Sequence, residues 1–295
     1  MAWLQVRLTT DAEQAPLIEA ALTNAGALAV TLGDAGDDPQ LEPAPGTQPL
    51  WGHLCITALF PDGPGALEQA AALGARLAGA LAAQPVVEYL PERAWERAWL
   101  DDFRPTRFGE RLWVCPRGQA PADAQALIVE LDPGLAFGTG HHATTALCLE
   151  WLDAAQLGGC TLIDYGCGSG ILAIAALRLG AAQATAVDHD PQALEATRDN
   201  ALANGVANRL RICAPAEPPL GAADVLVANI LAATLVELAP RLAELVRPGG
   251  RIALSGLLAD QVAAVSAAYE TTFALDPPRE REDWVLLSGR RLATD

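Results

Sequence analysis

The sequence predicts a two-domain α/β protein, in which a doubly wound, Rossmann-like parallel sheet follows a smaller ferredoxin-like α+β domain. From about Gly158 onwards, short apolar strand patterns alternate with helical patterns, which is typical of a parallel sheet. Residues 1–90 instead follow the order β-α-β-β-α-β. The length of 295 residues also suits two domains, since one domain usually has about 100–200 residues. We therefore expect domains at residues 1–90 and 106–295, joined by a linker helix at residues 91–105.

In the first domain, alternating apolar residues predict strands, and turn residues predict where the elements end. Asp11 is expected to cap the first helix, and Gly26 is expected to stop it after about Ala25. The residues 33–49 are rich in Gly, Asp and Pro and are expected to form a loop. The expected strands are Trp3–Leu8, Ala27–Leu32, Gly52–Phe60 and Val86–Leu90, and the second expected helix is Gly65–Ala83. A fold of this kind often serves recognition and by itself implies no chemistry.

The linker carries an aromatic stripe, because Trp95, Trp99 and Phe103 recur every four residues. We interpret this stripe as the docking face of the linker helix; a direct role in substrate binding is the alternative.

The second domain begins with short strand patterns and continues as repeated βα units. A last pair of strand patterns is expected to form a hairpin that closes the edge of the sheet. The expected strands are Leu112–Cys115, Ala126–Leu131, Thr161–Tyr165, Ala184–Asp188, Leu210–Cys213, Asp224–Asn229, Arg251–Ser255, Phe273–Leu275 and Trp284–Ser288.

The charge balance is acidic, with 19 Lys and Arg against 36 Asp and Glu and a net charge of −17. This balance disfavours nucleic acid, which proteins bind through Lys and Arg, and it favours a basic partner or serves solubility alone. The six cysteines form no CxxC pair, so we expect reduced thiols rather than a zinc site. Neither a signal peptide nor a membrane span is evident, and we expect a cytoplasmic protein.

The central motif is a glycine-rich turn that follows the apolar strand Thr161–Tyr165 and precedes a helix. Its glycines, at alternate positions, are Gly166, Gly168 and Gly170. Glycines in such a turn let the backbone approach a ligand closely. The dinucleotide motif GxGxxG would place a further glycine where Ile171 stands, so a dinucleotide is disfavoured. We expect a nucleoside cofactor with an amino-acid tail; a tight turn without a ligand is the alternative.

Two carboxylates accompany this turn. Asp188 ends the next strand, where it can accept hydrogen bonds from both ribose hydroxyls of a nucleoside. Asp164 lies just upstream of the glycines and is expected to help hold the ammonium group of the amino-acid tail.

Asn229 ends another apolar strand, at the sheet edge where α/β proteins place their ligands. Its side-chain amide can accept a hydrogen bond from a substrate amine and orient the lone pair of the nitrogen. The alternative is that Asn229 caps the helix that follows.

Glycines also flank His141 and His142 in the run FGTGHHATT, which starts at Phe137. Adjacent histidines rarely point at one ion and no acidic third ligand is evident, so we expect no metal. We expect a loop over the cofactor instead, with Thr145 and neighbouring backbone donors in contact with it.

These motifs together resemble the PrmA family, bacterial methyltransferases that modify the eleventh protein of the large ribosomal subunit. The resemblance covers essentially the whole chain. Its motifs are ERAWERAWLDDFRP, LDPGLAFGTGHHATT, DYGCGSGILAIAA, AVDHDP, VANILA and LSGLL. The combination is far more specific than any single motif.

The resemblance implies a class I methyltransferase domain that uses S-adenosylmethionine. It implies trimethylation of lysine side chains and of the N-terminal amino group of that ribosomal protein, a basic stalk-base protein captured by the N-terminal domain. Cofactor contacts carried over by motif position are Thr145, Gly166, Asp188 and Asn229. We expect a monomer without nucleic-acid specificity. The alternatives are a methyltransferase of another protein, a small-molecule amine or a nucleic-acid base, and a non-catalytic module that retains a cofactor fold.

Overall fold

The computed structural model describes residues 3–36, 50–63, 66–77, 79, 81–90, 104–123, 125–131, 142–216 and 221–293. The chain divides into two compact units, residues 1–98 and 99–295. Most of the expected linker helix lies outside the described residues, and Arg104 and Pro105, at its expected end, are not helical. No helix in the described ranges is long and apolar enough to cross a membrane.

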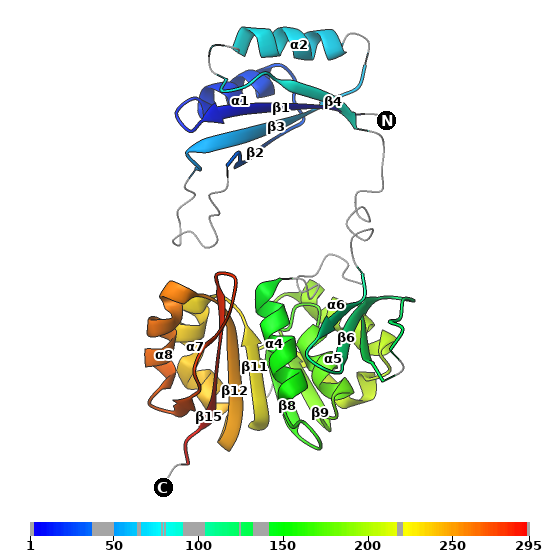
Figure 1. The fold of residues 1–295 in the computed structure, drawn as a ribbon, viewed down its shortest axis with the longest axis vertical. Helices are drawn as coiled ribbons and strands as arrows, with labels where there is room; N and C mark the ends of the chain where they lie inside the picture. Colours follow the sequence, from blue (N-terminus) through cyan, green and yellow to red (C-terminus); the bar gives the residue numbers. More distant parts are fainter. Residues whose placement is uncertain are drawn as a thin grey trace. The chain divides into compact units, whose positions relative to one another are not determined.

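The first unit is a four-stranded antiparallel sheet whose apolar core lies between one face of the sheet and two helices (Figure 1). The strands follow the spatial order β2-β3-β1-β4, which confirms the ferredoxin-like arrangement. Leu4, Val6 and Leu8 alternate along β1 and are fully buried against the helices. The elements are β1 (Trp3–Asp11), α1 (Ala15–Asn24), β2 (Ala29–Asp34), β3 (His53–Pro61), α2 (Ala66–Leu77) and β4 (Val86–Leu90).

Two details of this unit differ from the sequence prediction. Asp11 does not cap α1, because β1 extends to Asp11, whose carboxylate binds the His53 ring 2.8 Å away. Residues 81–83 are not helical, so the second helix is shorter than expected. The stop at Gly26 is confirmed, since Gly26 has a φ of 93° and directly follows Ala25, the C-cap residue of α1.

The second unit is built on a twisted sheet with the strand order β10-β9-β8-β11-β12-β15-β13, as the doubly wound prediction requires. Five strands from β10 to β12 are parallel, and β15 runs antiparallel to β12. The strands are β8 (Thr161–Tyr165), β9 (Gln183–Val187), β10 (Leu210–Cys213), β11 (Ala223–Asn229), β12 (Val246–Leu258), β13 (Phe273–Leu275), β14 (Arg279–Arg281) and β15 (Trp284–Arg291).

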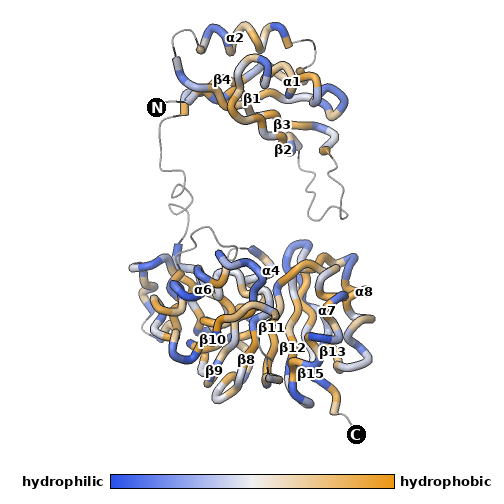
Figure 2. The backbone as a smooth tube through the Cα atoms, turned by 180° about the vertical axis from the view of Figure 1, so that it is seen from behind, coloured by the Kyte–Doolittle hydropathy of each residue, from blue (hydrophilic) through white to orange (hydrophobic). Residues whose placement is uncertain are grey.

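Helices cover both faces of this sheet (Figure 1). One apolar cluster contains residues of α4 (Ala143–Ala154), α5 (Ile171–Arg178) and α6 (Pro191–Ala203), and the other contains residues of α7 (Ala232–Glu244) and α8 (Val262–Tyr269). The central strands β8 and β11 are therefore largely buried, and β11 contains the apolar run Val225–Ala228 (Figure 2).

Three further strands form a small sheet in the order β5-β6-β7 that packs on α4 and α5. They are β5 (Thr106–Phe108), β6 (Leu112–Pro116) and β7 (Leu127–Leu131). The sequence prediction missed β5 and β14, which are short and, unlike the equally short β13, mostly polar. The predicted pairing of the last two strands is confirmed, but β13 forms the edge while β15 lies inside the sheet.

Candidate functional site

The predicted site residues converge on one edge of the large sheet. The parallel strands β9, β8 and β11 are neighbours, and their carboxyl ends lead into Asp188, the glycine turn and Asn229. The order of the strands reverses between β8 and β11, and doubly wound sheets bind ligands at such a point.

The glycine turn is held against β9 by backbone hydrogen bonds. The amides of Gly166 and Cys167 both donate to the Val187 carbonyl, at 2.8 and 3.0 Å. Gly166, Gly168 and Gly170 have φ values of 80°, 54° and 77°, a region that other residues rarely adopt. A Cβ at Gly170 would lie 2.7 Å from Thr197 Cγ2. Conformation and space therefore both require glycine in this turn.

Helix α6 supports the turn through two buried polar side chains that the sequence analysis missed. Thr197 Oγ1 donates to the Gly168 carbonyl and Asn200 Nδ2 donates to the Ser169 carbonyl, each at 2.9 Å. Both residues are essentially inaccessible to solvent. The signal in the sequence was a pair of polar residues three positions apart on one helix face.

Asp188 is 8% exposed and receives two backbone hydrogen bonds. Gly168 N donates to its Oδ2 at 2.9 Å, and Asp190 N donates to its Oδ1 at 3.0 Å. A carboxylate offers about four lone-pair positions, so capacity remains for hydroxyl donors of a ligand. The two amides also fix the carboxylate against the glycine turn.

Asp164 is fully buried, and its two oxygens differ. Ala173 N donates to Oδ2 at 3.0 Å, whereas Oδ1 has no hydrogen-bond partner among the described residues. Burial raises the pKa of this carboxyl to about 7, against the lowering effect of the Ala173 amide, and the charge of Asp188 adds to the rise. A buried carboxylate with an unmatched oxygen would be stabilised by a nearby cation, which fits an ammonium group.

Asn229 ends β11 and contacts Thr145, the third residue of α4. Its Nδ2 donates to Thr145 Oγ1 at 3.2 Å, which leaves Oδ1 as the acceptor that can face a substrate. The alternative that Asn229 caps the next helix is wrong, because Leu231 occupies the N-cap position of α7.

The N-terminus of α4 is fixed by His142. Its Nδ1 accepts from Thr144 N at 3.4 Å and lies 2.8 Å from Thr144 Oγ1. The imidazole packs edge-on against the Trp284 ring, with 4.8 Å between the ring centroids. His141 lies outside the described residues, as does the preceding run from Asp132. Within the described part of the chain, no three His, Cys, Asp or Glu side chains are grouped as metal ligands.

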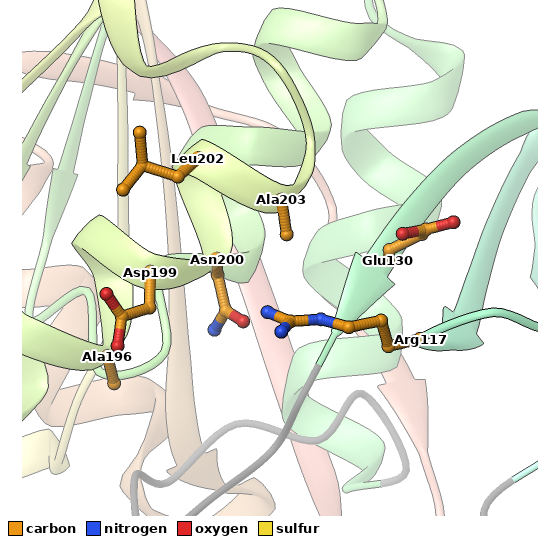
Figure 3. A pocket seen from close by; sticks show the side chains of 7 residues that line it. All are labelled: Arg117, Glu130, Ala196, Asp199, Asn200, Leu202 and Ala203. Atoms are coloured by element: carbon orange, nitrogen blue, oxygen red, sulfur yellow. The ribbon is translucent and has the colours of Figure 1, made fainter.

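A cavity of about 600 Å³ lies next to this site rather than in it (Figure 3). It opens between α6 and the ends of β6 and β7, and Arg117 extends into it. Asn200 joins the cavity to the glycine turn through its bond to Ser169. The lining contains none of the predicted site residues; its members are Arg117, Glu130, Ala196, Asp199, Asn200, Leu202 and Ala203.

Comparisons with known proteins show what this chain is similar to. The family model described as "Ribosomal protein L11 methyltransferase (PrmA)" matches residues 2–292. A ribosomal protein L11 methyltransferase of Alkalilimnicola ehrlichii is 54% identical over 295 residues, which are 99% of each chain. Its counterpart in Pseudomonas aeruginosa is also 54% identical, over 99% of this chain and 100% of that protein.

Among solved structures, a ribosomal protein L11 methylase from Lactobacillus delbrueckii subsp. bulgaricus is similar to this chain. It has 32% sequence identity and a TM-score of 0.59, and the match covers 64% of this chain and 100% of that one.

Proposed function

The chain belongs to the PrmA family of ribosomal protein L11 methyltransferases, and we propose that it transfers methyl groups from S-adenosylmethionine to lysine side-chain and N-terminal amino groups of ribosomal protein L11. The observation that carries this proposal is the placement of Asn229. Its amide lies at the carboxyl edge beside the glycine turn, and Thr145 fixes its orientation. In this proposal, the glycine turn binds the methyl donor and the neighbouring Asn229 binds the acceptor amine.

The described residues fit the methyl donor at three points. Asp188 is the acceptor for the ribose hydroxyls, since its carboxylate keeps free lone pairs beside the turn. Asp164, with its unmatched buried oxygen, supports the ammonium group. The alternate glycines, Gly166, Gly168 and Gly170, let the backbone approach the ligand without side chains in between.

When bound, S-adenosylmethionine supplies an electrophilic methyl group whose departure leaves a neutral thioether, so no acid is needed at the leaving group. The acceptor amine must be neutral, although a free lysine has a pKa near 10.4. Removal from water lowers the pKa of a lysine, because the charged form loses solvation. Asn229 Oδ1 then accepts an N–H of the neutral amine and aims the nitrogen lone pair. The hydrogen-bond partner of Asn229 is a hydroxyl rather than a carboxylate, which fits catalysis by positioning.

The N-terminal domain, residues 1–90, recruits the substrate in this proposal, and the 91–105 linker joins it to the catalytic domain, residues 106–295. Residues 1–90 contain ten Asp and Glu but only two Arg, Arg7 and Arg76. A basic ribosomal protein is therefore attracted to this domain, which speeds encounter. The enzyme would act as a monomer in the cytoplasm, on the protein alone and without specificity for nucleic acid.

The composition of the chain ensures that methyllysine found in the test of this function cannot come from the enzyme itself. All 19 basic residues are arginine, and the sequence contains no lysine. Purified L11 is incubated with the enzyme and S-adenosylmethionine, and the masses of both proteins are followed. Stepwise gains of one methyl group on L11 are expected, and any methyllysine must come from L11. If L11 gains no mass while calorimetry still shows binding of S-adenosylmethionine, the substrate is another protein or a small-molecule amine.

A further inference from the structure

Ile230, directly after Asn229, fills the space over the first glycine of the turn. A Cβ at Gly166 would overlap Ile230 Cγ2, and it would meet Ile230 Cβ at 3.8 Å. The branch methyl of Ile230 therefore occupies the place where any other residue at position 166 would carry its side chain. Ile230 is half-buried and packs against the apolar cluster that contains Ile163 and Ala228 of the two neighbouring strands.

The backbone of Ile230 is also in contact with β12. Its N–H donates to the Ser255 carbonyl at 3.1 Å. Gly256 follows at an irregularity in the register of β12 and has a φ of 85°. A Cβ at Gly256 would lie 2.8 Å from the carbonyl carbon of Ile230 and 3.0 Å from its nitrogen. The peptide of Ile230 thus rests directly on the bare α-carbon of Gly256.

Ile230 is consequently wedged between two glycines, one in the cofactor turn and one in β12. Because Asn229 directly precedes Ile230, these two contacts restrict how far Asn229 can shift relative to the turn. Tightly packed groups of this kind transmit displacement, because interiors are packed like solids.

We propose that Ile230 is a positioning residue, whose Cγ2 methyl sets the distance between the glycine turn and the Asn229 amide. This inference rests on the proposed function, in which the turn holds the methyl donor and Asn229 holds the amine. Ile230 touches neither reactant in this account and acts through its two neighbours. A displacement of about 1 Å can lower the rate of an enzyme a hundredfold, so we expect the loss of this one methyl group to lower kcat.

Two substitutions separate the branch methyl from the volume of the side chain. Ile230→Val keeps both γ-carbons and loses the terminal methyl, whereas Ile230→Leu keeps the volume and loses the branch at Cβ. A role in packing alone predicts that the smaller valine is the worse variant. A role of Cγ2 in positioning predicts that leucine is worse. Ile128→Leu, on the half-buried strand β7, is the matched control for the substitution itself.

The experiment measures kcat and KM with L11 and, independently of any substrate, hydrogen exchange in peptides that cover residues 165–170 and 228–232. For Ile230→Leu we expect kcat to fall at least about tenfold with KM within about threefold, and exchange to accelerate in both peptides. Ile230→Val and Ile128→Leu should stay within about threefold of the parent in kcat, with unchanged exchange.

Equal exchange in the valine and leucine variants, or a larger loss of kcat with valine, would overturn the assignment. If the parent enzyme leaves L11 unmodified, the proposed substrate fails, while the exchange data still decide whether Ile230 couples the two segments.

Discussion

Asn229 and Thr145 are 84 residues apart in the chain, yet the amide of the first donates to the hydroxyl of the second at 3.2 Å. This bond orients the only polar side chain that β11 presents at its carboxyl end.

Replacement of Asn229 by Ala should lower kcat about a hundredfold or more, since the amine loses its acceptor. Steady-state kinetics on L11 measures the effect. Asn208→Ala, at an exposed position in the 3-10 helix Ala207–Arg209, is the matched control. Full activity of Asn229→Ala would exclude the role.

Thr145→Val should have a smaller effect, about tenfold on kcat. Valine keeps the shape of the 2% exposed threonine but removes the acceptor, so the Asn229 amide is no longer held in one orientation. The melting temperature should change little compared with kcat, and a parallel loss of both would indicate a structural role instead.

Asp188→Asn should weaken binding of S-adenosylmethionine about 10- to 100-fold, because hydrogen bonds to a charged acceptor are worth about 1.5–3 kcal/mol. Isothermal calorimetry gives the dissociation constant directly. Asp62→Asn, an exposed aspartate of the first unit, should bind the cofactor like the parent. An unchanged affinity of Asp188→Asn would mean that the Asp188 carboxylate only accepts the hydrogen bonds of the Gly168 and Asp190 amides and does not bind the cofactor.

Asp164 should make stability depend on pH in a direction opposite to most carboxylates. Its pKa is raised to about 7 by burial, whereas an unfolded aspartate has a pKa near 3.9. Between these values the folded chain keeps a proton that the unfolded chain has lost, so stability falls as the pH rises from about 4 to 7 and is level above that. The total effect is on the order of 4 kcal/mol.

Urea unfolding of the parent and of Asp164→Asn, compared at several pH values, tests this dependence. The asparagine variant lacks the titration, so the difference between the two curves should change across this pH window. Parallel curves would show that the pKa of the Asp164 carboxyl is the same in the folded and the unfolded chain.

Substitution of two glycines of β12 distinguishes the stability cost of backbone strain from the cost of a steric clash. Gly249 and Gly256 both have positive φ, at 75° and 85°, but a Cβ at Gly249 would meet nothing within 4 Å. Gly249→Ala should therefore cost about 1 kcal/mol from conformation alone. Gly256→Ala should cost at least about 2 kcal/mol, because the new methyl also strikes the peptide of Ile230. Tryptophan fluorescence during urea unfolding measures both, and equal losses would refute the contact.

Ionic strength should change KM for L11, which reflects recruitment of the substrate, and should leave kcat unchanged. If the acidic first domain attracts a basic substrate, KM for L11 should rise severalfold between low salt and about 0.5 M salt, while kcat stays constant. The affinity for S-adenosylmethionine, measured under the same conditions, is the reference. A KM that does not change with salt would rule out electrostatic recruitment.

The glycine turn, Asp188 and Asn229 could be predicted because each lies where an apolar strand ends, and local sequence marks such ends. The contacts of Asn229 could not be predicted, since Thr145 comes from a helix far away in the chain. The role of Gly256 was equally hidden, because a glycine in a strand does not reveal which backbone approaches it. Asp11 was assigned wrongly as a cap, since its partner His53 is 42 residues away in the chain and pairs with it at the end of β1.

The position of β15 has a consequence for the biogenesis of the protein. This strand is made last among the strands of the large sheet, but it lies between β12 and β13 and brings Trp284 against His142. A nascent chain that has reached only residue 280 has therefore exposed the edge of β12 without its partner, which is a surface prone to aggregation. Chains cut short before Trp284 would lack the antiparallel partner of β12, so we expect them to aggregate rather than to persist as partly active fragments.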